Sequence, residues 1–280
     1  MDKAEAILSA QHITKAYPLP DGGKLLALND VSVEVPRGKL TILKGRSGSG
    51  KTTLMNILCG LDQPTEGKVQ MDGKEITEMG DLDLTRLRRK DIGFVFQSVA
   101  LIPIMTAAEN VEYALRLAAW QGDRQARVKE CLEMVGLAKR MSHLPNEMSG
   151  GEQQRVAIAR AIAHGPKMVF ADEPTGELDT NTALQVVKIF KELNRTQGVT
   201  ILMTTHDKGF MEIGDRVYSL ENGVLQELRK RNTSSSATTW SRSTRPTRPR
   251  SWPCRAWTAR WSAASSWLSS AIPAAARAPS

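Results

Sequence analysis

The sequence predicts an α/β fold that combines a mixed, partly parallel sheet with an inserted helical subdomain. Short β-rich runs alternate with helical patterns along most of the chain, which is typical of helices that connect parallel strands. This alternation stops between about residues 107 and 165, where helical stretches follow one another, so we expect a helical lobe inserted into the core. The 280 residues suffice for one large or two modest domains with a buried core.

The expected strands are short apolar runs, such as LTILK and VTILMT. In chain order, strands are expected at residues 31–35, 40–44, 68–71, 92–96, 167–171, 199–204 and 216–220. Helices are expected at residues 52–59, 107–120, 124–135, 152–163 and 182–193. In the last helix, Ala183, Val187, Phe190 and Leu193 recur at helix spacing and predict one buried stripe.

The net charge of +8 is concentrated at the end of the chain. Residues 230–280 hold nine Lys or Arg and no Asp or Glu, which leaves 29 basic against 30 acidic residues before them. A nearly neutral body argues against nucleic-acid binding, because phosphate recognition normally needs clustered Lys and Arg. We therefore expect no nucleic-acid partner.

Residues 232–280 form a tail that differs in composition from residues 1–231, so we expect a domain boundary between them. The tail is rich in Ser, Thr, Arg, Pro, Ala and Trp without a helix or strand period, which predicts disorder. It is interpreted either as a basic segment that contacts anionic lipid or nucleic acid, or as out-of-frame or artefactual sequence with no evolved role.

The spacing of the cysteines and the shortness of the apolar runs favour a cytoplasmic protein. The three cysteines lie far apart and form no C-x-x-C pair, which argues against a disulfide framework or a zinc site. The sequence starts without an apolar run typical of a signal peptide, and no run approaches the roughly 18–20 apolar residues of a membrane span. Any membrane role would therefore require docking onto another protein.

The segment GRSGSGKTT, residues 45–53, matches the G-x-x-x-x-G-K-[ST] loop and lies between an expected strand and an expected helix. Glycines let consecutive backbone N–H groups point at phosphate oxygens, and the helix N-terminus adds positive potential. We expect Lys51 to reach the β- and γ-phosphates of ATP and Thr52 to bind Mg²⁺. The expected phosphate-binding residues are Gly45, Ser47, Gly48, Ser49, Gly50, Lys51, Thr52 and Thr53. The alternative, a chance glycine-rich turn, is disfavoured by the flanking elements, and the loop predicts a P-loop NTPase core.

The apolar strand MVFA is followed by two acids, Asp172 and Glu173. Asp172 is placed to hold Mg²⁺, and Glu173 to act as the general base that polarises the attacking water. Alone, this pattern would more often be a strand end with solvated carboxylates. Its occurrence beside a phosphate loop favours the catalytic interpretation.

The segment MSGGEQQR, residues 148–155, resembles the signature motif of the ABC ATPases. Ser149, Gly150 and Gly151 precede an expected helix that includes Glu152, which makes a second anion site at a helix N-terminus. One chain needs a single phosphate cradle for each nucleotide. The second site therefore predicts that two chains pair head to tail, each completing the ATP site of the other, as ABC ATPases do.

Further residues match positions of this family, and their roles are what the resemblance implies. Tyr17 matches the aromatic residue that stacks on adenine, and Gln97 matches the glutamine that senses Mg²⁺ and the attacking water. His206 matches the histidine that contacts the γ-phosphate. The alternatives are structural roles: Tyr17 as a half-buried tyrosine, Gln97 as a polar strand-end residue and His206 as a structural histidine. The resemblance also implies an ABC ATPase fold whose helical subdomain spans about residues 97–165.

The loop with Leu178 and Asp179 matches the family's interface loop, so Asp179 is expected near the partner's nucleotide. The departures are small: Met148 replaces Leu, Glu152 replaces Gln, and Glu177 stands where a small or amide residue is commoner. The resemblance covers about residues 6–228.

Details such as ADEPTGELDT are similar to the branch of macrolide-export and lipoprotein-release ATPases. This implies a homodimer, or a pair with a similar subunit, that powers separate membrane permease subunits from the cytoplasmic face of the membrane. The apolar run SVALIPIM, residues 98–105, is interpreted as a docking surface together with the helix at 107–120. The alternative is an ordinary core connection.

Two rival functions are an ABC protein that acts on nucleic acid or the ribosome, and a scaffold that binds nucleotide without hydrolysis. The neutral body and the single cassette disfavour the first. The presence of Glu173 and His206 disfavours the second.

Overall fold

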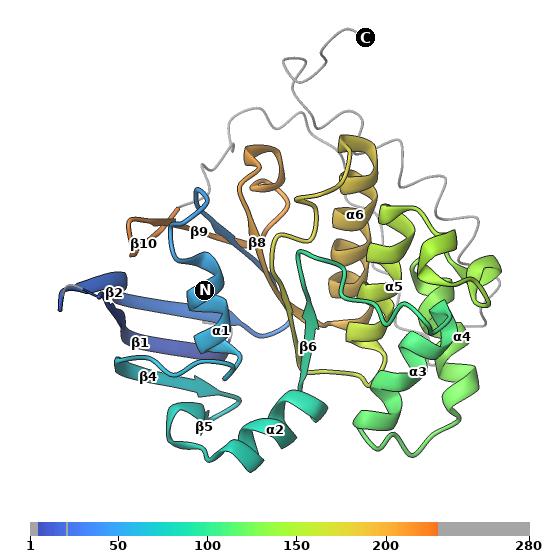
Figure 1. The fold of residues 1–280 in the computed structure, drawn as a ribbon, viewed down its shortest axis with the longest axis horizontal. Helices are drawn as coiled ribbons and strands as arrows, with labels where there is room; N and C mark the ends of the chain where they lie inside the picture. Colours follow the sequence, from blue (N-terminus) through green and yellow to red (C-terminus); the bar gives the residue numbers. More distant parts are fainter. Residues whose placement is uncertain (1–4, 21, 229–280) are drawn as a thin grey trace, which may run out of the picture. The chain divides into compact units, whose positions relative to one another are not determined.

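The computed structural model describes residues 5–20 and 22–228. The predicted tail at residues 232–280 lies outside the described residues, as do residues 1–4, 21 and 229–231. The described chain forms two sheets with six α-helices around them (Figure 1). The predicted mixed α/β fold is confirmed.

The first sheet is antiparallel and has the strand order β2-β1-β4-β5. Its strands are β1 (Ala6–Pro18), β2 (Lys24–Pro36), β4 (Glu66–Met71) and β5 (Lys74–Glu75). In β1 the pairing register shifts between Ala10 and Ile13, where His12 has a φ of 54°. This irregularity bends β1 between its two partners.

The second sheet has the order β10-β9-β3-β8-β7-β6 and is parallel except for β10. Its strands are β3 (Leu40–Lys44), β6 (Ile92–Val95), β7 (Met168–Ala171), β8 (Thr200–Thr205), β9 (Arg216–Glu221) and β10 (Val224–Glu227). The carboxyl ends of parallel strands lie at one edge of the sheet. The site residues that follow β3, β7 and β8 therefore lie close together.

Three helices, α3 (Ala107–Leu117), α4 (Arg124–Met134) and α5 (Gly150–Ile162), lie between β6 and β7 in sequence and pack on one another. They gather on the side away from β1 and β2 (Figure 1). The other helices are α1 (Lys51–Leu58), α2 (Asp81–Lys90) and α6 (Thr180–Gln197). The boundaries 97–165 for a helical subdomain stay a prediction, because these helices share a continuous core with the parallel sheet.

Strand β7 separates two hydrophobic cores. Met168 and Phe170 face a core shared with α1 and the antiparallel sheet, whereas Val169 and Ala171 face a core shared with α3 to α6. Successive side chains of a strand point to opposite faces, so a strand buried on both sides must be apolar throughout. The sequence MVFA meets this requirement and fixes the position of the two acids that follow it.

Candidate active site at the carboxyl edge of the parallel sheet

The glycine loop joins the end of β3 to the start of α1, as predicted. Gly50, the residue before α1, has a φ of 98°, and a Cβ there would lie 2.7 Å from the carbonyl oxygen of Ala27. Only glycine accepts this conformation and this contact. The Ser49 hydroxyl of the same loop is buried and has no hydrogen-bond partner. An unsatisfied buried hydroxyl is rare in folded proteins, and a phosphate oxygen bound in the loop would give it an acceptor.

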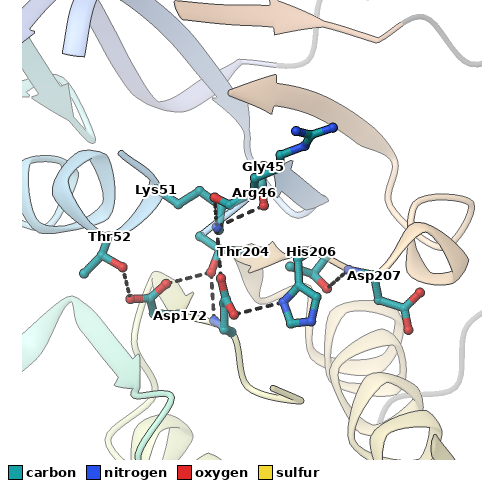
Figure 2. Close-up of polar contacts among 10 residues, drawn as sticks. Gly45, Arg46, Lys51, Thr52, Asp172, Thr204, His206 and Asp207 are labelled. Carbon is teal, nitrogen blue, oxygen red and sulfur yellow. Dashed lines mark hydrogen bonds and ion pairs between the residues drawn. The ribbon is translucent and has the colours of Figure 1, made fainter. Parts of the chain in front are cut away.

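The side chain of Lys51 is buried and turns back into the loop (Figure 2). Its ammonium donates to the carbonyl oxygens of Gly45, at 3.0 Å, and Arg46, at 2.9 Å. The same Nζ lies 2.9 Å from Oε1 of Glu173. The cation of the loop and the predicted base are thus direct partners across two different strand ends.

Asp172 is held by two hydroxyl groups. Thr52 Oγ1 donates to Asp172 Oδ2 at 2.9 Å, and Thr204 Oγ1 donates to Asp172 Oδ1 at 2.7 Å (Figure 2). Hydroxyl and carboxylate oxygens are the ligands that Mg²⁺ prefers, so the pair Thr52 and Asp172 fits that ion chemically. Among the described residues there is no group of three His, Cys, Asp or Glu side chains that could hold a metal alone. Mg²⁺ at this pair would keep positions for further oxygen ligands, such as phosphate oxygens and water.

Glu173 has a φ of 42°, a conformation that non-glycine residues adopt rarely and at a cost of order 1–3 kcal/mol. Its backbone N–H donates to Thr204 Oγ1 at 2.7 Å, which holds this turn in place. Burial raises the pKa of the Glu173 carboxyl, but the hydrogen bond and charge of Lys51, with a smaller contribution from His206, lower it below the usual range. Glu173 is therefore an ionised carboxylate in this arrangement.

His206, directly after β8, places Nδ1 3.0 Å from Oε2 of Glu173. Gln97 is exposed, and its side chain lies near Gly176, as this carboxylate does. A Cβ at Gly176 would lie 3.5 Å from Glu173 Oε2 and 3.6 Å from Gln97 Nε2. The structure thus brings Lys51, Thr52, Asp172, Glu173 and His206 together, with Gln97 at their edge.

Thr204 is the site residue that the sequence analysis missed. It is fully buried, holds the Asp172 carboxylate and the Glu173 backbone, and so links β8 to the end of β7. The available signal was the pair of threonines that ends the apolar run TILMTT just before His206.

The second predicted anion site lies at the start of α5. Ser149 is the N-cap, and its Oγ accepts the backbone N–H of Glu152 at 3.3 Å. Gly151 packs against Thr182 so closely that a Cβ there would lie 2.1 Å from Thr182 Cγ2. No contact described for Ser149 involves the glycine loop of the same chain. The two predicted anion sites are separate features of the described structure.

Tyr17 and Asp179 make structural contacts. The Tyr17 hydroxyl donates to Asp62 Oδ2 at 3.3 Å, and the Lys15 ammonium lies 5.1 Å from the centre of its ring, which is partly exposed. Asp179 caps α6, with Oδ1 accepting the backbone N–H groups of Asn181 and Thr182. Their roles toward adenine and toward a partner's nucleotide stay predictions.

A strand–glycine loop–helix cradle beside an acid-bearing strand defines a nucleotide-hydrolysing protein of the P-loop class. Comparison with known proteins places the chain more narrowly, since residues 28–176 match the ABC transporter family. Among relatives, the lipoprotein-releasing system ATP-binding protein LolD of Alcanivorax borkumensis is 42% identical over 81% of this chain and 100% of its own. The macrolide export ATP-binding/permease protein MacB of Chlorobaculum tepidum is 43% identical over 79% of this chain, which spans only 34% of that longer protein.

A solved structure of the ATP-binding cassette MJ0796 of Methanocaldococcus jannaschii, dimeric and bound to ADP and Pi, matches with a TM-score of 0.73. It is 39% identical and covers 79% of this chain and 99% of its own. The chain belongs to the ABC transporter family, in the branch that includes MacB and LolD. It is an ATP-binding and ATP-hydrolysing subunit of an ABC transport complex.

Proposed function

We propose that two copies of this chain close head to tail around two ATP molecules and drive separate membrane permease subunits. The observation that carries the proposal is the separation of the two anion sites. Lys51 of the glycine loop forms an ion pair with Glu173. Ser149 instead caps a different helix, α5, and the contacts described for it involve neither Lys51 nor Glu173. A second chain facing the first would supply Ser149 and Gly151 to the γ-phosphate that the first chain holds. The dimeric, ADP-bound relative MJ0796 supports this arrangement.

Within one chain, the loop residues bind the phosphates. Backbone N–H groups from Gly45 to Thr53 and the N-terminus of α1 would hold the phosphate oxygens. Lys51 would exchange its bonds to Glu173 and the loop carbonyls for bonds to the β- and γ-phosphates. The unpartnered Ser49 hydroxyl would gain an acceptor in the same step. Tyr17 would stack on adenine.

Thr52 and Asp172, with Gln97, would hold Mg²⁺, because their oxygens are hard ligands next to the predicted position of the phosphates. When bound, Mg²⁺ neutralises the charge that develops on the phosphate oxygens. Thr204 donates to the other oxygen of Asp172 and would help to keep this carboxylate oriented.

Glu173 would act as the general base for the attacking water, and His206 would hold its carboxylate in place and contact the γ-phosphate. Loss of Lys51 as a partner removes the main influence that lowers the pKa of Glu173. ATP binding would therefore make Glu173 a stronger base at the moment when it is needed. Most of the rate acceleration would come from positioning and from charge stabilisation.

The membrane partner would dock on the apolar run at residues 98–105. Ile104 is 86% exposed there, whereas Leu101 is partly buried against the core. Arg160 of α5 donates to the carbonyl oxygens of Ala100, at 2.6 Å, and Val99, at 3.4 Å. These hydrogen bonds connect the run to α5, the helix that Ser149 caps.

Within the described residues no helix combines the length and apolar character that a membrane crossing requires. We place the chain on the cytoplasmic face of the membrane, bound to its permease subunits.

Mixing two defective variants tests the composite site. Lys51→Ala removes the cradle cation and Ser149→Ala removes the hydroxyl of the second anion site. Each variant alone should hydrolyse ATP poorly. An equimolar mixture should recover activity, since a mixed dimer contains one site with both groups intact. A mixture as inactive as its components, although mixed dimers form, would overturn the proposal.

A further inference from the structure

The Glu152 carboxylate accepts the hydrogen bond of the Ser149 hydroxyl, which is the group that the second anion site needs. Glu152 Oε2 accepts the backbone N–H of Ser149 at 2.9 Å and the Ser149 hydroxyl at 3.0 Å. A serine hydroxyl carries one hydrogen, so it cannot donate to Glu152 and to a phosphate at the same time. The side chain that orders the start of α5 therefore competes with any phosphate for Ser149.

The same carboxylate introduces a negative charge beside a predicted phosphate site. The backbone N–H of Ser149 is the main cause that lowers the pKa of Glu152, followed by the Ser149 hydroxyl and the charges of Arg140 and Arg155. Glu152 is thus ionised at neutral pH. A phosphate oxygen could replace Glu152 as the acceptor of the Ser149 hydroxyl. It would then lie within a few ångströms of the Glu152 carboxylate, and at this distance the two negative charges repel each other strongly.

Arg140 is the one residue that forms a salt bridge with Glu152 in the described part of the chain. It lies at the end of a short 3₁₀ turn, Ala138–Arg140, and its Nε is 3.2 Å from Glu152 Oε1, the oxygen that Ser149 does not use. Its Nη1 also contacts His143 Nε2 at 3.0 Å, which fixes the direction of the guanidinium. Arg140 can therefore retain one carboxylate oxygen while the other releases Ser149.

We propose that Arg140 is a positioning residue of the second anion site: it holds and neutralises the Glu152 carboxylate so that Ser149 can donate to a γ-phosphate carried by a second copy of this chain. The inference rests on the head-to-tail dimer proposed above. It adds that an acidic residue at position 152 requires a cation at position 140, whereas a neutral amide at position 152 would not.

A double-mutant cycle tests this dependence. ATP-driven dimerisation is measured by sedimentation velocity in a Glu173→Gln background, in which hydrolysis is slow. Arg140→Ala should weaken dimerisation by roughly 5- to 10-fold, because the Glu152 carboxylate loses its salt-bridge partner beside the phosphate. In chains that also carry Glu152→Gln, Arg140→Ala should change dimerisation less than about twofold, since the charge that it compensates is gone.

Lys139→Ala is the matched control. Lys139 is the preceding residue in the same turn, is exposed and carries the same charge, and it has no contact with Glu152 among those described. Its removal should leave dimerisation unchanged. Arg140→Lys, which keeps the cation, should retain most of the affinity. If Arg140→Ala does not fold, Arg140→Gln replaces it in the cycle.

The outcomes separate the two proposals. A parent chain that binds ATP but never dimerises refutes the head-to-tail dimer itself. In a second outcome the parent chain dimerises, but Arg140→Ala weakens dimerisation equally in chains with and without Glu152→Gln. This result would show that Arg140 only supports its turn, and it would overturn the inference. An Arg140→Ala variant that dimerises like the parent overturns it as well.

Discussion

Lys51 Nζ lies 2.9 Å from Glu173 Oε1, so the cation of the phosphate loop and the predicted catalytic base neutralise each other. Both side chains are largely buried, and the φ of 42° at Glu173 turns its side chain back toward the loop. In the proposed mechanism, a phosphate that enters the loop would take Lys51 as its partner and free the Glu173 carboxylate. The ion pair would thereby link nucleotide binding to the basicity of Glu173.

Glu173→Gln should abolish hydrolysis and preserve ATP binding. The amide can still contact Lys51 and His206, but it cannot accept a proton from water, so kcat should fall by at least about 100-fold. Steady-state ATPase assays and ATP-dependent sedimentation measure the two effects, and the variant should accumulate as an ATP-bound dimer. Glu66→Gln, which changes an exposed acid of β4 outside the site, is the control and should retain the parent rate. Undiminished turnover by Glu173→Gln would assign the base to another residue.

Gly151→Ala should destabilise the fold more than Gly150→Ala. A Cβ at Gly151 would lie 2.1 Å from Thr182 Cγ2, and Thr182 cannot rotate freely because its hydroxyl donates to Asp179 Oδ2 at 2.5 Å. Overpacking of this kind lowers the free energy of unfolding by about 1–3 kcal/mol. A Cβ at Gly150 meets nothing nearer than Leu178 Cδ2 at 3.9 Å. Chemical denaturation of both variants checks this, and equal losses would contradict the packing argument.

Asp72→Asn should remove a pH-dependent contribution to stability. Hydrogen bonds from Lys167 and then Arg37 lower the pKa of the Asp72 carboxyl from 3.8 to about 2. Folding therefore favours the ionised form, and the stabilisation is complete above about pH 4 and lost as the pH falls through about 2. Because the ion pairs are partly exposed, we expect a loss of about 1 kcal/mol at pH 7.

Denaturation of the Asp72→Asn variant and its parent across pH 2 to 7 provides the measurement. The two stability curves should converge toward pH 2. Asp83→Asn, which removes an exposed pair with Arg86, is the control and should have a smaller effect. Curves that stay parallel over the whole range would exclude Asp72 as the titrating group.

Ile104→Asp should uncouple transport from hydrolysis. The side chain is 86% exposed in the proposed docking run, so a charge there would disrupt an apolar contact with the permease without disturbing the core. Basal ATPase activity should stay within about twofold of the parent. Leu101→Asp is a poorer test, because Leu101 packs against the core. Leu82→Asp, at an exposed position of α2, is the matched control. Transport at the parent rate by Ile104→Asp would reject the docking surface.

The sequence predicted the elements that carry the phosphate site with small errors. Strand β3 has the predicted bounds, and α1 begins at Lys51, one residue before the predicted start. Both are marked by strong local signals, a compact apolar run and a glycine loop. Strand β1 was missed because its alternation is interrupted at the irregularity near His12. Helix α2 was missed because only Leu84 and Leu87 of its ten residues are buried.

The candidate site was predictable where adjacent residues carry the chemistry, as in Gly45–Thr53 and Asp172–Glu173. The contacts between residues that lie far apart in the sequence were not predictable. The roles of Thr204 and Arg140 depend on the positions of side chains 32 and 12 residues away in the chain, which only the fold brings together. The capping role of Asp179 likewise became visible only when the start of α6 was known.

The most direct test of the composite site is the ATPase rate per chain measured over a range of protein concentrations, with the oligomeric state followed by sedimentation in the same solutions. If each site needs Lys51 from one copy and Ser149 from another, the rate per chain should fall toward zero as dilution leaves only monomers. A rate per chain that stays constant at concentrations where only monomers are present would contradict the account.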